Sequence, residues 1–109
     1  MAFVLKKSNT VKWPVTFQKA ANGGKFKKQT FTAIFKELGR DQFNELADKG
    51  DDPLINEIFV GWEGVQDEEK NEIPFNEENK TALLDDFAIM KALIETYGQV
   101  IYGGGLEKN

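Results

Sequence analysis

The chain has 109 residues and a formal net charge of −4, and its 40% hydrophobic and 12% aromatic content is typical of a folded globular protein. It contains no cysteine and no histidine, which excludes disulfides, thiol chemistry and the usual near-neutral acid–base group. No apolar run approaches the roughly 18 residues that would span a membrane, and residues 1–7 lack the apolar core of a signal peptide. We therefore expect one soluble, cytoplasmic domain.

The charge is divided between the two halves of the chain. Residues 1–40 carry nine Lys or Arg and one acid, a net charge of +8, whereas residues 41–109 carry five Lys and seventeen acids, a net charge of −12. Such asymmetry indicates either an interaction surface at each end or a lysine-bearing sheet face beside solvated acidic helices. Both interpretations are open at this level.

Alternating side chains predict two strands in the first third of the chain. Residues 11–18 and 26–35 each alternate between apolar and polar positions, which is typical of half-buried strands. Pro14 cannot donate to a sheet ladder, so the first strand is expected at a sheet edge or at a bulge. The segment 22–24, Asn-Gly-Gly, favours positive φ and joins the strands into a hairpin. Phe3 and Leu5 could add a third, short strand.

After residue 40 the apolar spacing becomes helical. A short helix is expected over 41–49, ended by Gly50, and a second over 52–60, with Asp52 as its cap and Pro53 at its first position. The apolar stripe of this second helix has i, i+3, i+4 and i+7 spacing and consists of Ile55, Ile58, Phe59 and Trp62. Gly61 is expected to stop the helix, and the predicted core anchors around it are Trp62, Phe59, Ile73 and Phe75.

Two further helices follow a charged loop over 64–75. The third is expected over 76–85 with Asn76 as its cap, and the fourth begins at the cap Asp86. Strands that precede helices favour an α+β fold, here an N-terminal β-hairpin or small antiparallel sheet packed on about four short C-terminal helices. We expect this domain to cover residues 1–102 and residues 103–109 to form a flexible C-terminal tail.

The second half also carries short motifs in a fixed order: Trp62-Glu63-Gly64-Val65, an acidic turn, Ile73-Pro74-Phe75-Asn76-Glu77-Glu78-Asn79, then Leu83-Leu84-Asp85. This string resembles that of the tail assembly chaperones of long-tailed, siphovirus-type bacteriophages. Two departures are Asn71, where the family often has Gly in the acidic turn, and Asp86-Phe87, where it often has Pro at the start of the last helix.

The resemblance implies a chaperone that binds the tape measure protein, keeps its long apolar helices soluble and helps recruit tail tube subunits. Members of that family often have a longer, frame-shifted form, and whether this chain has one is open at this level. It also implies action in the cytoplasm of the infected bacterial host and absence from the mature virion. The alternatives are a structural tail or head-completion protein and, third, an RNA-binding regulator.

Two kinds of surface are candidates for contacts with other chains. The apolar stripe of the last helix is wider than a small domain needs, so it is expected to bind a partner through Met90, Ile94, Tyr97, Ile101 and Tyr102. Self-association is expected between a basic hairpin face (Lys12, Lys25, Lys27, Lys28) and an acidic set (Asp67, Glu68, Glu69, Glu72, Asp85, Asp86).

Other chemistry finds little support in the residues. Asp67, Glu69, Asn71 and Glu78 have the spacing of a calcium loop, but Glu72 stands where that loop needs Gly. No nucleophile–base arrangement or phosphate-binding motif is present. The acidic chain disfavours nucleic acid despite the lysines near Phe26. We therefore expect no enzyme activity, no cofactor, no metal, and neither nucleic acid nor membrane as a partner.

Overall fold

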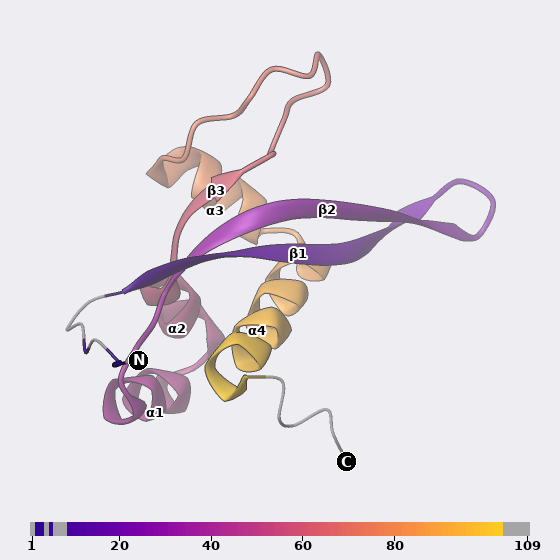
Figure 1. Ribbon diagram of the computed structural model, residues 1–109. Helices are drawn as coiled ribbons and strands as arrows, with labels where there is room; N and C mark the ends of the chain where they lie inside the picture. Colours follow the sequence, from indigo (N-terminus) through magenta and orange to yellow (C-terminus); the bar gives the residue numbers. More distant parts are fainter. Residues whose placement is uncertain (1, 4, 6–8, 104–109) are drawn as a thin grey trace.

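The computed structural model, which describes residues 2–3, 5 and 9–103, has an α+β fold, as predicted (Figure 1). An antiparallel sheet of three strands, in the order β1-β2-β3, consists of β1 (Thr10–Ala21), β2 (Lys25–Lys36) and β3 (Phe59–Glu63). The four helices are α1 (Arg40–Lys49), α2 (Asp51–Ile58), α3 (Glu77–Leu84) and α4 (Phe87–Tyr102). None of the helices in the described part is long and apolar enough to cross a membrane.

The first two strands form one long hairpin in continuous register. Thr10 pairs with Lys36 at the open end and Ala21 with Lys25 at the turn, where Gly23 and Gly24 both adopt positive φ. Pro14 lies on β1, an edge strand, so its missing N–H is tolerated, as predicted. Side chains of residues 18–30 are exposed on both faces, and the tip of this segment, termed the arm, projects beyond the helices (Figure 1).

The core lies between the sheet and α4, which packs mainly against β1. Phe31, Ala33 and Phe35 point from β2 into this core, as their alternation predicts. Leu93 and Tyr97 meet them from α4, and the Phe35 and Tyr97 ring centroids lie 5.3 Å apart. One face of the sheet is therefore covered by the last helix of the chain.

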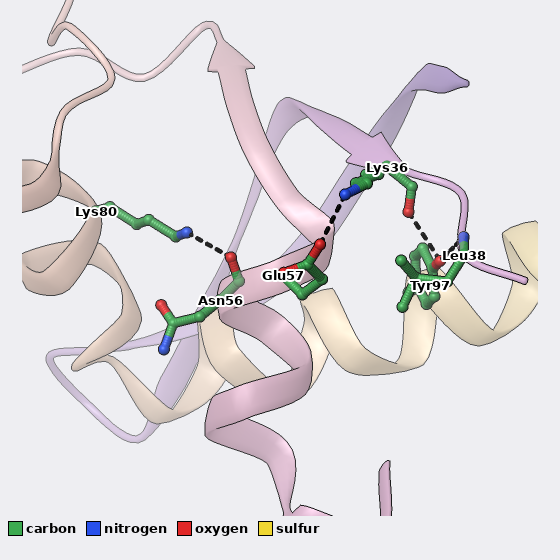
Figure 2. Close-up of polar contacts among 6 residues, drawn as sticks. All are labelled: Lys36, Leu38, Asn56, Glu57, Lys80 and Tyr97. Atoms are coloured by element: carbon green, nitrogen blue, oxygen red, sulfur yellow. Dashed lines mark hydrogen bonds and ion pairs between the residues drawn. The ribbon is translucent and has the colours of Figure 1, made fainter. Parts of the chain in front are cut away.

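Polar contacts link the C-terminal end of β2 to α2 and α4, and they link α3 to α2 (Figure 2). The Tyr97 hydroxyl donates to the Lys36 carbonyl (2.9 Å) and accepts from the Leu38 N–H (3.0 Å). Lys36 Nζ lies 2.7 Å from Glu57 Oε2, and the buried Lys80 ammonium donates to the Asn56 carbonyl (3.1 Å). These contacts tie β2, α2, α3 and α4 to one another.

The predicted helix over 52–60 is too long, because Phe59–Glu63 is a strand. Phe59 has φ −96° and ψ 99°, and it pairs with Phe35, while Trp62 pairs with Ala33. Gly61 is part of this strand and does not adopt a left-handed conformation, so its predicted role as a helix stop is wrong. The helical spacing extends through Trp62, but pairing with β2 overrides it.

The ends of several elements also differ from the predictions. Helix α2 begins at Asp51 and has Gly50 at its cap without a side-chain hydrogen bond, so Asp52 lies in the first turn. Phe3 and Leu5 are exposed and do not belong to a strand. Gly103, at φ 62°, ends α4, and residues 104–109 of the predicted flexible tail lie outside the described residues.

Candidate partner-binding surface along the last helix

The start of α4 is fixed by Asp86, the predicted cap. Its carboxylate accepts hydrogen bonds from the Ala88 N–H (2.9 Å) and the Ile89 N–H (3.3 Å), and the Lys19 ammonium of β1 also donates to it. The bond from Lys19, followed by those from the backbone, lowers the pKa of Asp86 below its ordinary value. The cap therefore stays ionised near neutral pH and sets Phe87 as the first residue of the helix.

Helix α4 has a buried face and an exposed ridge. The buried face points into the core and consists of Ile89, Ala92, Leu93 and Tyr97. The ridge contains Phe87, Lys91 and Glu95 at helical i, i+4 and i+8 spacing, and all three are exposed. Phe87 is 94% exposed, which makes it the most exposed large apolar side chain among the described residues.

A hollow lies on each side of this ridge. The first, of about 440 Å³, is termed the α2–α4 groove and is lined by Asp51, Asp52, Phe87, Met90, Lys91, Ile94 and Glu95. The second, of about 620 Å³, lies against β1 and is lined by Thr16, Phe17, Gln18, Phe87, Ala88, Lys91, Ala92 and Glu95. A third hollow, of about 380 Å³, lies at the other end of α4 and is lined by Leu38, Arg40, Phe43, Asn44, Ile101 and Tyr102.

The predicted partner-binding residues lie in three different surroundings. Met90 and Ile94 are half-buried walls of the α2–α4 groove, and Ile101 and Tyr102 line the hollow at the C-terminal end of the helix. Tyr97 is 1% exposed, so the expectation that it is part of an exposed stripe is wrong. Phe43 of α1 stacks on Tyr97 at 6.1 Å between ring centroids and covers it. Burial also raises the pKa of the Tyr97 hydroxyl.

Phe87 is the residue that the sequence analysis missed. The predicted apolar stripe begins at Met90, whereas Phe87 shares its helical ridge with Lys91 and Glu95. A large apolar side chain on an otherwise charged ridge is the signal that could have identified it.

The four lysines proposed for self-association are not on one face. The hairpin register places Lys12 and Lys28 on one side of the ribbon and Lys25 and Lys27 on the other. Lys12 is also engaged, because its Nζ lies 2.6 Å from Glu63 Oε2.

The acidic residues of the same proposal have different surroundings. Asp67 accepts hydrogen bonds from the N–H groups of Glu69 and Asn71, both at 2.9 Å. These bonds lower the pKa of Asp67, and the bond from Asn71 has the larger effect. Asp86 is engaged as the helix cap, while Asp85, Glu68, Glu69 and Glu72 are exposed.

The acidic turn contains three of the residues that have the spacing of a calcium loop, Asp67, Glu69 and Asn71. Lys70 adopts positive φ there, at 67°. Within the described residues, no three or more Asp and Glu side chains come together in an arrangement that could hold a metal ion.

These features define a small α+β protein with an exposed ridge on its last helix, headed by the apolar Phe87, and a projecting basic hairpin. The chain belongs to the YdaY prophage protein family, whose model matches residues 25–101, from the start of β2 to the last turn of α4. It is therefore a phage-derived protein. No curated protein and no solved structure has significant similarity to it.

Proposed function

We propose that this prophage protein is a non-enzymatic tail assembly chaperone that binds the tape measure protein, keeps it soluble and helps recruit tail tube subunits. The observation that carries the proposal is the position of Phe87, which is 94% exposed between two hollows on α4. A large apolar side chain left in water beside apolar hollows marks a contact for another chain. The resemblance of residues 62–85 and the prophage family of the chain support the choice of partner.

The surface suits a helical client. The α2–α4 groove runs beside α4 and offers Phe87, Met90 and Ile94 to an apolar stripe of a partner helix. Amphipathic helices bind apolar grooves in this way, with anchors spaced three and four residues apart. The net charge of −4 would keep a chaperone–client complex charged while the client's apolar residues are covered.

A pull-down from cells in which the prophage is induced tests this function. The expected result is recovery of the tape measure protein without assembled tails. Recovery of assembled tails would favour the structural tail component, and recovery of nucleic acid would favour the RNA-binding regulator. Either result in place of the tape measure protein contradicts the proposal.

Two variants separate contact by the ridge from non-specific adhesion. Phe87→Ser should reduce recovery of the tape measure protein at least about 30-fold, since a central apolar anchor is worth about 2 kcal/mol or more. Val60→Thr is the matched control, because Val60 is an exposed apolar residue of β3 that lines none of the three hollows along α4. Its recovery should equal that of the wild type.

A further inference from the structure

The arm, residues 18–30, has the composition of a binding element. It carries four positive charges and no acid, from Lys19, Lys25, Lys27 and Lys28. Phe26 lies near the tip and is 68% exposed, although it is large and apolar. The tip projects beyond the helices, so it has no core to cover there (Figure 1). An extended ribbon of this kind gains little stability from burial in its own chain.

The charges of the arm are unfavourable within the monomer. Lys19 lies directly opposite Lys27 across the two strands, and like charges in that position destabilise a hairpin. Asp86 contacts Lys19, but Lys25, Lys27 and Lys28 form no ion pair with any described residue. The arm therefore lacks an anionic partner in the described part of its own chain.

The α2–α4 groove has the complementary properties. Its apolar wall is formed by Phe87, Met90 and Ile94, and its volume of about 440 Å³ exceeds the roughly 150 Å³ that accommodates a benzene ring. Three exposed acids, Asp51, Asp52 and Glu95, border it against one base, Lys91. None of these four charges forms an ion pair with a described residue.

We propose that the arm of one copy docks in the α2–α4 groove of a second copy. Phe26 enters the apolar part of the groove, and Lys28 contacts Asp51 and Asp52. Phe26 and Lys28 share one face of the ribbon, because residues two apart in a strand point to the same side, about 6.6 Å apart. The arm projects away from α2 of its own chain, so the contact is between copies (Figure 1).

This contact joins two different surfaces, and such heterologous contacts extend into open chains unless the rotation closes a ring. It does not depend on the proposed function, since it requires only the purified chain. It does have a consequence for that function: a client on the ridge and the arm of a second copy compete for Phe87.

Sedimentation velocity of the purified protein over a concentration series tests the contact. The wild type should form species larger than a monomer, whereas Phe26→Ser and Phe87→Ser should each be monomeric, with association weakened at least about 30-fold. Both side chains are exposed, so both variants should retain the wild-type melting temperature. Mixed together, the two variants should form a dimer that cannot extend, because one supplies an intact groove and the other an intact arm.

Two charge reversals give a matched pair. Lys28→Glu and Lys27→Glu change the net charge equally, but Lys27 lies on the opposite face of the arm. Lys28→Glu should weaken association about two- to fivefold more than Lys27→Glu, the range of an exposed ion pair. The difference should shrink at 1 M salt, where the Debye length is about 3 Å.

A wild type that stays monomeric at all concentrations would overturn the proposal, as would a mixture of the two serine variants that fails to dimerise. Equal effects of the two charge reversals would remove Lys28 from the contact. If a single-stranded oligonucleotide bound through Phe26 and the lysines while the protein stayed monomeric, the arm would be a nucleic-acid element instead.

Discussion

Trp62 joins the end of the sheet to the segment that leads into α3. Its Nε1–H donates to the Ile73 carbonyl (2.7 Å), and its ring lies 5.8 Å from that of Phe59 and 4.8 Å from that of Phe75. Lys80 lies over the Phe75 ring at 5.7 Å, and its ammonium is bound by a backbone carbonyl of α2. One side chain thus holds β3 and the following loop together, and through Phe75 it reaches α3.

Trp62→Ala should cost roughly 3–5 kcal/mol of the free energy of unfolding, because it removes an aromatic side chain that is 8% exposed. Trp62→Phe keeps much of the apolar area and loses the hydrogen bond to Ile73, so its cost should be smaller. Chemical denaturation of both variants measures this. A loss below about 1 kcal/mol for the alanine variant would show that Trp62 is not part of the core.

Asp86 makes the stability of α4 depend on pH. Its pKa in the folded protein is lower than the ordinary 3.8, so the stability it contributes is complete above about pH 4 and is lost as pH falls through the folded pKa. Asp86→Asn keeps a capping oxygen but loses the charge that faces Lys19. The variant should be less stable at pH 7 by up to about 1 kcal/mol, and the difference should shrink below pH 4. Urea denaturation at pH 7 and pH 3 checks this; a constant difference would contradict it.

At the scale of elements, the pairing of β3 with β2 places Gly61 opposite Ile34, and the lack of a side chain at Gly61 leaves room for that of Ile34. A Cβ added at Gly61 would lie 2.9 Å from Ile34 Cδ1 and 3.3 Å from Ile34 Cβ. Real Cβ atoms essentially never come as close as the first of these distances, so the Ile34 side chain would have to shift to admit a larger residue. Glycine at position 61 therefore lets β3 pair with β2 without displacing the Ile34 side chain.

Gly61→Ala should destabilise the fold by about 1–3 kcal/mol, the usual cost of overpacking. Ile34→Val removes the Cδ1 atom of the closest contact, so the double variant should recover part of that loss. Thermal melts of the two single variants and the double variant form a cycle. Strictly additive effects would show that the clash with Ile34 is not the cause.

Some elements could be predicted from the sequence, whereas others depend on contacts between distant residues. The hairpin and the caps Asn76 and Asp86 depend on local patterns, and the structure has them where the patterns place them. Strand β3 could not be foreseen, because residues 55–62 keep helical spacing and only pairing with the distant β2 decides otherwise. Exposure along α4 was equally non-local, because Phe43 of α1 covers Tyr97 whereas Phe87 is left 94% exposed.

At the scale of the whole molecule, only part of the division of charge seen in the sequence becomes a separation in space, because Lys12, Lys19 and Lys36 pair with acids of the second half. The basic residues of the arm lie at one end of the hairpin, and the acids Asp51 and Asp52 lie at the start of α2, away from the tip (Figure 1). Helix α4 presents the ridge headed by the exposed, apolar Phe87. This arrangement is typical of a protein that acts through contacts at its surface, and the ridge is the proposed site for a client.

The soluble fraction of the tape measure protein from the same prophage, co-expressed with this chain, tests the central claim most directly. Alone, the tape measure protein should be found in the pellet, and wild-type chain should move most of it into the supernatant. Phe87→Ser should leave it in the pellet, whereas Val60→Thr should act as the wild type. A tape measure protein that stays insoluble with the wild type, or is equally soluble with Phe87→Ser, would contradict the account.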